Sequence, residues 1–332
     1  MRLQICRGNA LANKSLYRPA HRIVSMDNYL SVSLVIPAWN ESERIIDCIE
    51  NATKQSMPAK EVIVTDNMST DNTRQLVRDY IDSHPNTNVI LLEQNEKQGL
   101  IPTRNYGIAH ATGDIIGRFD ADCMIRPNWV ETVSRFFTEN PEIMGATGPV
   151  TYYDMPARKV SLKGDAKIRT EQYMADGGEV LLFGSNMAVR ATAWEQIKDE
   201  VCADEKDIFH EDIDVSLHLM DNNLKTGYCP QMVNALSARR MDTSITSFFR
   251  YMKRFKNTFD AHPNHWRSGH PEISVSALYP WLHMLYPIYQ KYLKSREINP
   301  AEQVWLEEQI ELLHKAEEAG QAVSDIASPE EN

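Results

Sequence analysis

Asp120 and Asp122 have the residue type and the spacing of a site for a divalent cation. They are separated by one alanine and directly follow the predicted strand 114–119. Alternate residues of a strand share a face, so two carboxylates at a strand end can hold one ion. Mg²⁺ and Mn²⁺ prefer such oxygen ligands and often share them with the phosphates of a substrate.

Further acidic positions are candidates for ligand binding and for proton transfer. Asp66 follows the apolar segment 61–65, and it can either accept a hydrogen bond from a nucleobase or cap a turn. Glu211 and Asp212 precede the predicted helix 213–220, where they can complement the helix dipole. Alternatively, Asp212 can act as a general base, which requires a pocket, a suitable pKa and an acceptor hydroxyl within reach.

Alternating strands and helices are expected to bring several of these acids together. Short β-branched runs predict strands, and apolar residues at helical spacing predict helices between them. The predicted strands are 31–37, 61–65, 89–92 and 114–119, and the predicted helices are 41–54, 69–81 and 101–111. This order predicts a mostly parallel α/β sheet with helices on both faces, in which ligands bind at the carboxyl ends of the strands. Asn40-Glu41, Asp66 and Asp120 to Asp122 all fall at such ends.

The second half of the chain has a less regular pattern. We expect a helix at 129–138, a weak strand at 144–153, a polar loop at 154–180, a strand at 181–190 and an extended segment at 226–238. From residue 244 the pattern is helical, with an acidic amphipathic helix at 303–319. The chain therefore divides into a basic, flexible N-terminal extension (1–29), an α/β domain (30–240), a C-terminal helical region (241–320) and an acidic tail (321–332).

The composition is that of a soluble globular protein, with 42% hydrophobic and 24% charged residues among 332. The formal net charge of −11 does not favour nucleic acid as a partner. No apolar run reaches the roughly 18 residues needed to cross a bilayer. The five cysteines are widely spaced without a C-x-x-C pair, which argues against a disulfide framework and for a reducing compartment. We expect a cytoplasmic protein.

Two local clusters have alternative interpretations. Residues 248–255 interleave aromatic and basic side chains, so they can contact a membrane surface or nucleic acid, or pack against the α/β domain with their cations near the site. We favour the packing, with contact at the cytoplasmic face of a membrane as the alternative. His262, His265 and His270 lie close together in the sequence, but they have no cysteine beside them, which favours a loop over a zinc site.

The segments around the acids resemble the inverting glycosyltransferases of family 2, which have the GT-A fold. The resemblance runs from residue 32 to about residue 240. It is carried by an ordered set of motifs, namely VSLVIPAWNE, EVIVTDNMSTDNT, a G-x-x-x-x-R-N-x-G stretch at 99–107, the D-x-D at 120–122, GSNMAVR at 184–190 and the E-D pair at 211–212. It implies a GT-A domain with a C-terminal helical extension, a nucleotide-diphosphate sugar as donor, and a hydroxyl acceptor such as a lipid-linked or cell-envelope glycan.

The resemblance also implies roles for single residues. Asp212 would be the catalytic base, and Glu211 would orient the acceptor. Asp122 would bind Mn²⁺ or Mg²⁺ directly, with Asp120 near the ion and the ribose. The residues implied at the nucleotide are Pro37, Ala38, Asn40, Glu41, Asp66 and Arg104. The residues implied at the sugar and the acceptor are Gly184, Ser185 and Asn186.

This sequence departs from the family pattern at two places. Many relatives have an aspartate and a glycine where this chain has Asn67 and Met68. Some relatives have a metal-binding histidine after the E-D pair, where this chain has Arg239 and Arg240. These arginines either grip the diphosphate directly or form a solvated basic turn.

Two other functions are compatible with parts of the pattern. A sugar-nucleotide pyrophosphorylase shares the sheet and the cation chemistry, but it would carry a glycine-rich basic loop after the first strand, and the segment PAWNES has no glycine. A non-catalytic scaffold that binds a nucleotide sugar could keep Asp66 while losing Asp212. This chain has both, which favours catalysis.

Overall fold

The computed structural model describes residues 29–175, 178–204, 208–263, 265 and 271–308. The extension up to residue 28, the part of the helical region beyond residue 308 and the acidic tail lie outside these ranges. Most of the acidic helix predicted at 303–319 lies outside them as well. Two sheets organise the described chain, one of seven strands in the order β3-β2-β1-β4-β8-β6-β9 and one of three in the order β5-β10-β7.

The first half of the large sheet has the predicted alternation. Strands β1 and β2 are buried along their whole length, as β-branched runs in a parallel sheet covered on both faces require. The elements are β1 (Val32–Ala38), α1 (Ile45–Thr53), β2 (Glu61–Asp66), α2 (Thr73–Ser83), β3 (Val89–Glu93), α3 (Leu100–Ala109) and β4 (Ile115–Arg118). Strand β1 pairs in parallel with both β2 and β4, and Ala38 lies opposite Asp66. The carboxyl ends of β1 and β2 therefore lie side by side.

The second half of the large sheet is mixed. Strand β8 runs antiparallel to its neighbours β4 and β6, whereas β6 and β9 are parallel. The elements are α4 (Trp129–Glu139), β6 (Ile143–Thr147), β8 (Met187–Arg190), α6 (Ala191–Ile197), α7 (Glu211–Asp221) and β9 (Lys225–Tyr228). The predicted class, a mostly parallel α/β sheet flanked by helices, is confirmed.

A small sheet lies beyond the carboxyl end of β4 and changes the setting of the two aspartates. It consists of β5 (Cys123–Ile125), β7 (Val150–Tyr152) and β10 (Asn234–Leu236). Asp120 and Asp122 lie between β4 and β5, with Asp122 in a turn. Both carboxylates follow the strand, as predicted, but they do not share the face of one strand. Their proximity comes from the reversal of the chain between the two sheets.

The polar loop predicted for residues 154–180 is also wrong, because helix α5 (Arg158–Ala175) occupies most of this segment. Asp165 anchors it, since its Oδ2 accepts hydrogen bonds from Val150 N and Arg169 Nε, both at 2.8 Å. Few apolar residues of α5 are buried, and Val160 is 71% exposed. The helix therefore lacks the apolar stripe that sequence periodicity detects. The strand predicted at 181–190 is shorter, covering only β8.

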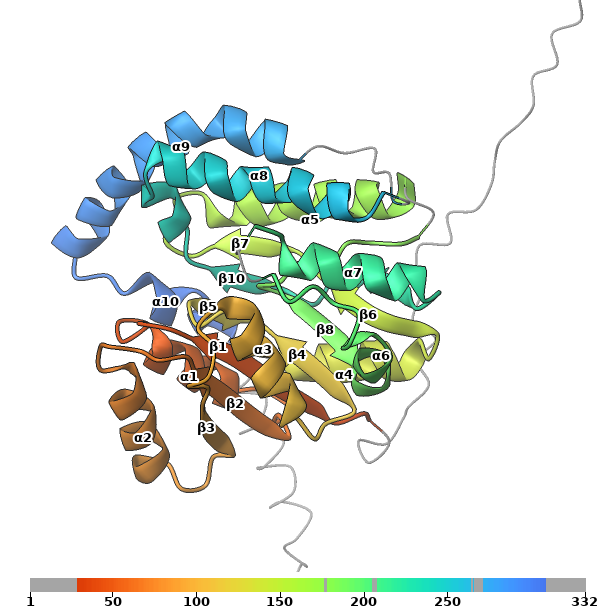
Figure 1. Ribbon diagram of the computed structural model, residues 1–332. Helices are drawn as coiled ribbons and strands as arrows, with labels where there is room; N and C mark the ends of the chain where they lie inside the picture. The colour runs from red at the N-terminus through yellow and green to blue at the C-terminus, as the bar shows by residue number, and fades with distance from the viewer. Residues whose placement is uncertain (1–28, 176–177, 205–207, 264, 266–270, 309–332) are drawn as a thin grey trace, which may run out of the picture.

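The C-terminal region consists of the 3₁₀ helix η2 (Arg239–Asp242), α8 (Ile245–Ala261), α9 (Pro271–Ser295) and α10 (Pro300–Gln303). Helices α8 and α9 lie above the small sheet, whereas α10 lies beside β5 and α1 (Figure 1). Phe248 of α8 stacks on Tyr279 of α9 with ring centroids 3.6 Å apart. Near the end of the described chain, Trp305 returns to β5, where its Nε1 donates to Met124 O at 2.8 Å. Among the described helices, none combines the length and hydrophobicity that crossing a bilayer requires.

Substitution by alanine is expected to change the free energy of unfolding in opposite directions at Gly148 and at Gly164. A Cβ at Gly148 would lie 2.0 Å from Met232 O, a backbone atom, whereas a Cβ at Gly164 would meet nothing within 4 Å. We expect Gly148→Ala to lower the free energy of unfolding by about 1–3 kcal/mol through overpacking. Gly164→Ala, within α5, should raise it by up to about 1 kcal/mol. Urea denaturation measures both changes, and equal stability of the two variants would contradict the packing around β6 and β7.

Candidate active site

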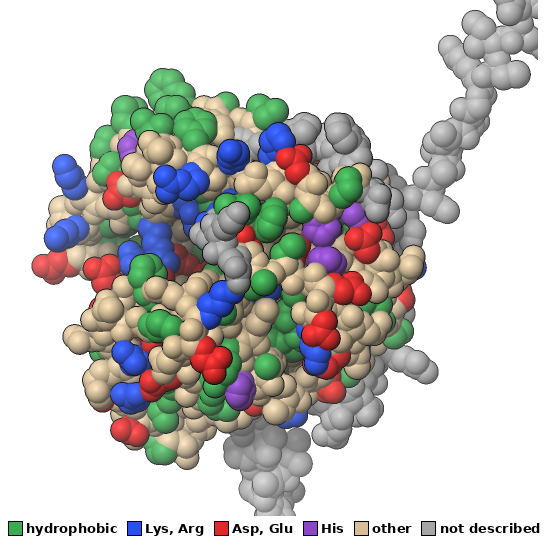
Figure 2. Space-filling model, viewed as in Figure 1, with side chains coloured by type: hydrophobic (Ala, Val, Ile, Leu, Met, Phe, Trp, Pro, Cys, Tyr) green, Lys and Arg blue, Asp and Glu red, His purple; other side chains and the backbone are tan. Residues whose placement is uncertain are grey.

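The predicted acids meet where the carboxyl ends of β1, β2 and β4 face the start of helix α7. In the space-filling view, acidic and basic side chains gather around a hollow at the left of the molecule, between the C-terminal helices and α1 to α3 (Figure 2). The contacts below connect Glu41, Asp120, Asp122 and Glu211 through two arginines; Asp212 adjoins Glu211, and Asp66 ends the neighbouring strand β2. They therefore belong to one site.

Arg118, at the end of β4, connects two of the acids and was not predicted from the sequence. It is 2% exposed, and its Nη2 lies 2.9 Å from Asp120 Oδ1 and 3.1 Å from Glu211 Oε1. Burial opposes its charge, but Asp120 and Glu211 raise the pKa of Arg118 above its usual value, so it stays a cation. The only local signal was a basic residue in an otherwise apolar strand, two positions before Asp120.

Asp120 is held in its ionised form. Its Oδ2 accepts a hydrogen bond of 2.6 Å from the Ser185 hydroxyl. Burial by itself would raise the pKa of Asp120, but the Arg118 cation and this hydrogen bond bring the pKa below its usual value. Ser185, implied at the sugar by the resemblance, thus lies directly beside the first acid of the D-x-D.

Asp122 lies in a different electrostatic environment. Burial, with the neighbouring charges of Asp120 and Glu41, raises the pKa of Asp122 to about 7, although Arg239 opposes the shift. Arg239 Nε lies 2.8 Å from Asp122 Oδ2, and its two terminal nitrogens donate to the two carboxylate oxygens of Glu41 at 2.8 and 2.6 Å. Arg239 therefore bridges two acids that both face the predicted cation site. A solvated basic turn, one of the two interpretations of this position, does not describe these contacts.

Asp212 is buried in the first turn of α7 and lies beside Gly184. Gly184 N donates a hydrogen bond of 2.7 Å to Asp212 Oδ2. Burial raises the pKa of the Asp212 carboxyl, while the Gly184 N–H and the Arg118 charge moderate the shift. A Cβ at Gly184 would lie 2.3 Å from Arg118 Nη1 and 3.2 Å from Asp212 Oδ2. Only glycine fits between these groups without displacing them.

Asp66 and Asn40 form the other end of the site. Asp66 is fully buried; its Oδ2 accepts from Ser69 N at 3.2 Å and lies 3.4 Å from Arg74 Nε. Its Oδ1 accepts no hydrogen bond from the described residues. Asn40, in the left-handed region with φ 54°, accepts from Thr70 N at 2.8 Å and donates from its own N to Ser69 Oγ. The two loops that follow β1 and β2 are therefore joined, with a buried carboxylate oxygen available as an acceptor.

Two of the residues implied at the donor and the acceptor are buried. Arg104, expected at the nucleotide, is 1% exposed, and its guanidinium donates to Asn105 Oδ1 and to Glu211 O. It therefore supports α7 from behind. Asn186, expected at the sugar, is fully buried, and its side chain bonds Trp129, Pro149 and Met232. With the chain in this arrangement, both side chains support the site from within the protein. Pro37 and Ala38 lie buried at the end of β1.

The residues around the D-x-D fit a hard divalent cation. Single ligand atoms of Asp120, Asp122 and Cys123 all lie within 4.8 Å of one another. Cys123 is fully buried and its thiol is a soft donor, so the two carboxylates are the suitable donors for a hard cation. Oxygen donors of this kind suit Mg²⁺ and Mn²⁺. A bound ion would compete with Arg239 for Asp122.

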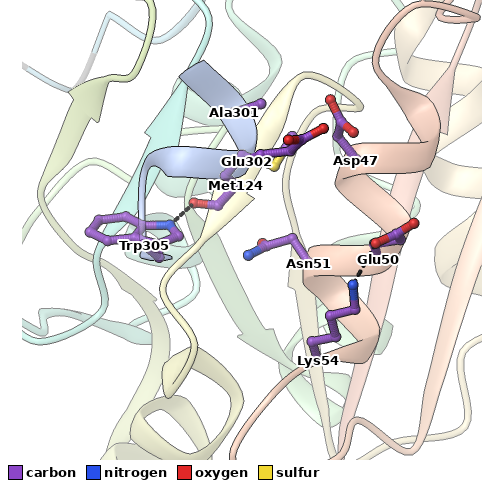
Figure 3. A pocket seen from close by; sticks show the side chains of 8 residues that line it. All are labelled: Asp47, Glu50, Asn51, Lys54, Met124, Ala301, Glu302 and Trp305. Atoms are coloured by element: carbon purple, nitrogen blue, oxygen red, sulfur yellow. Dashed lines mark hydrogen bonds and ion pairs between the residues drawn. The ribbon is translucent and has the colours of Figure 1, made fainter. Parts of the chain in front are cut away.

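A separate pocket lies behind this site and contains none of the predicted site residues. It has a volume of about 300 Å³ and lies between α1, β5 and α10 (Figure 3). Its lining includes the carboxylates Asp47, Glu50 and Glu302, and burial raises the pKa of Asp47. The pocket lies at the interface where α10 packs against the α/β domain.

Residues 33–197 match a family model described as Glycosyl transferase family 2. Among curated proteins, the glycosyltransferase AglE of Haloferax volcanii is 33% identical over 124 residues, which cover 36% of this chain and 40% of that protein. A dolichyl N-acetyl-α-D-glucosaminyl phosphate 3-β-D-2,3-diacetamido-2,3-dideoxy-β-D-glucuronosyltransferase of Methanococcus voltae is 26% identical over 234 residues, which cover 66% of this chain and 70% of that protein. The chain thus spans less than half of the first relative and about two thirds of the second.

Among solved structures, a mannosyltransferase from Pyrobaculum calidifontis in complex with GDP-Man and Mn²⁺ has a TM-score of 0.54 and 18% identity. The match covers 89% of this chain and 84% of that one, and at this identity it shows the fold alone. It confirms the predicted GT-A architecture. The family model and the relatives together show that this chain belongs to glycosyltransferase family 2.

Proposed function

We propose that this protein transfers a sugar from a nucleotide-diphosphate donor to a hydroxyl acceptor, with inversion at the sugar carbon, in the synthesis of a lipid-linked or cell-envelope glycan. The observation that carries the proposal is the position of Asp212. Its carboxylate is fixed by Gly184 N–H, next to the ion pairs that join Arg118 to Asp120 and Glu211. A proton acceptor thus lies beside the acids suited to a cation.

Three groups of the site are suited to the donor. The free Oδ1 of Asp66 can accept a hydrogen bond from a nucleobase N–H. Asp122 and Asp120 are the proposed ligands of Mn²⁺ or Mg²⁺, and an ion bound there would stabilise the charge that develops on the diphosphate leaving group. The Pyrobaculum mannosyltransferase, solved with GDP-Man and Mn²⁺, supports this choice of ligands through its shared fold.

Arg239 is suited to change partners when the donor binds. Its side chain is 40% exposed, in contrast to Arg118 at 2%. Guanidinium groups form bidentate hydrogen bonds with phosphate oxygens as readily as with carboxylate oxygens. We therefore assign the diphosphate to Arg239, which would leave Asp122 free for the ion.

Asp212 is the proposed general base. Its raised pKa favours acceptance of a proton from the acceptor hydroxyl as that hydroxyl attacks the sugar carbon. Positive charge develops at that carbon as the bond to the diphosphate breaks, and attack from the opposite face inverts the configuration. Glu211, held by its ion pair with Arg118, can orient the acceptor.

The alternative functions lack comparable support. A pyrophosphorylase would require a glycine-rich basic loop after β1, and residues 37–42 read PAWNES. A scaffold that only binds a nucleotide sugar would not require a buried carboxylate with a raised pKa at the position of Asp212.

The outer face of α9 is suited to a membrane that carries a lipid-linked acceptor. Large apolar side chains are exposed along one stripe of this helix, namely Leu278, Trp281, Leu285, Ile288 and Tyr292. Figure 2 shows hydrophobic side chains gathered at the top of the view, over α9, with Lys and Arg side chains beneath them. An apolar stripe with an aromatic residue and flanking cations is typical of helices that lie in the interface of an anionic bilayer. The Methanococcus relative, whose name specifies a dolichyl phosphate, supports an acceptor of this class.

Asp212→Asn should abolish transfer while retaining binding of the donor. Loss of the base lowers the rate by about 10²–10⁴-fold. The increase in Tm produced by Mn²⁺ with UDP- or GDP-sugars should persist, because ligand binding stabilises the fold by mass action. Release of nucleoside diphosphate with dolichyl N-acetylglucosaminyl phosphate as acceptor measures transfer. Asp82→Asn, on the exposed face of α2, is the matched control; wild-type transfer by Asp212→Asn would exclude this residue as the base.

Gly184→Ala should reduce transfer without unfolding the protein. The added methyl group displaces Arg118 Nη1 and the carboxylate of Asp212, and a misplacement of about 1 Å can cost roughly 10²-fold in rate. The same transfer assay measures the loss, and circular dichroism checks the fold. Gly164→Ala is the control. Full activity of Gly184→Ala would show that the contacts between β8 and α7 do not position the base.

Ile288→Asp should weaken binding to anionic vesicles. Burying one large apolar side chain contributes about 1.5–3 kcal/mol, so the loss is at least about tenfold in the partition constant. Co-sedimentation with phosphatidylglycerol vesicles measures it. Tyr106→Asp, on α3 across the molecule, is the control because Tyr106 is also exposed. Equal binding of the two variants would rule out α9 as the lipid-binding face.

A further inference from the structure

Four side chains with metal-binding chemistry converge at a second place, apart from the D-x-D. They are Cys202, Asp214, His218 and His262, and one ligand atom from each lies within 4.8 Å of the others. Cys202 follows α6, Asp214 and His218 belong to α7, and His262 directly follows α8. Three segments far apart in the sequence thus supply one sulfur, two imidazole nitrogens and one carboxylate.

The geometry centres on the carboxylate of Asp214. Asp214 and His218 are four residues apart on one helix, so they share a face. Asp214 Oδ1 lies 2.9 Å from His262 Nε2 and 3.6 Å from His218 Nε2. At 3.6 Å the latter contact is too long for a hydrogen bond, and His218 Nε2 makes none with the described residues. Two imidazole nitrogens are therefore directed at one carboxylate.

Two of the four groups are buried, the other two are partly buried, and the carboxylate is held in place. Asp214 is 2% exposed and His262 is 8% exposed. Cys202 N donates to Asp214 Oδ2 at 2.8 Å, which fixes the carboxylate. Glu200 Oε2 lies 3.7 Å from His218 Nδ1, on the far side of the ring from Asp214. Outer carboxylates of this kind orient metal-binding imidazoles and raise their basicity.

We propose that Cys202, Asp214, His218 and His262 bind one Zn²⁺ ion. A set of one thiolate, two imidazoles and one carboxylate suits zinc in tetrahedral coordination, whereas Mg²⁺, Ca²⁺ and Mn²⁺ prefer oxygen donors. Four protein ligands leave no open position, so the ion is structural. It joins the end of α8 to α7, the helix whose first turn carries Glu211 and Asp212.

Metal analysis of the full chain tests the proposal directly. After reconstitution with zinc sulfate and dialysis, we expect one equivalent of zinc per chain and a higher Tm than that of the chelator-treated protein. Replacement by Co²⁺ should give the near-ultraviolet charge-transfer absorption of a cobalt–thiolate bond. Both readouts are independent of sugar transfer. A chain that retains no zinc, or a wild-type cobalt spectrum without thiolate absorption, would overturn the proposal.

Matched variants assign the ligands. Cys202→Ser should lose the charge-transfer absorption. His262→Gln should weaken zinc binding by more than the roughly 10- to 100-fold that loss of an outer-shell partner costs. His265→Gln is the control, since His265 pairs with Asp221 and lies outside the set. Asp122→Asn should also retain zinc, because the D-x-D is a separate site. Equal zinc affinity of His262→Gln and His265→Gln would overturn the assignment.

Discussion

A buried cation determines the arrangement of the active site. Arg118 has almost no contact with water, and an unpaired charge at such a position would cost several kcal/mol. Its partners Asp120 and Glu211 come from segments more than 90 residues apart along the chain. Because the folded state is stable only when these charges are paired, the end of β4 and the start of α7 are held together. Asp212, the proposed base, is positioned as a result.

A second arginine, Arg239, also pairs with two acids but is accessible to a ligand. Arg239 bridges Glu41 and Asp122 from a half-exposed position, so its charge can be satisfied by a ligand as well as by the protein. Arg118 has no such freedom. The site thus contains one fixed cation that maintains its geometry and one accessible cation that can exchange partners with an ion and a diphosphate. The difference between them is burial, since both make ion pairs with two carboxylates.

Helix α7 connects the proposed chemistry with the proposed zinc site. Its first turn carries both the proposed base Asp212 and the proposed zinc ligand Asp214, and His218 lies one turn beyond Asp214. A zinc ion bound to these residues and to His262 would fix α7 against α8. Because the proposed base also belongs to α7, such an ion would link the orientation of α8 to the position of Asp212.

The sequence by itself determined the α/β order, the ends of the first four strands and the clustering of acids at those ends, because buried parallel strands leave a local apolar pattern. It did not determine the roles of Arg104 and Arg118, which look alike along the chain; one supports α7 from behind and the other pairs with two acids. It also missed α5, whose exposed surface has no periodic signal, and the approach of Cys202 to His262. Burial and pairing between distant segments decided these features, and such contacts depend on the path of the whole chain, which local residue patterns do not encode.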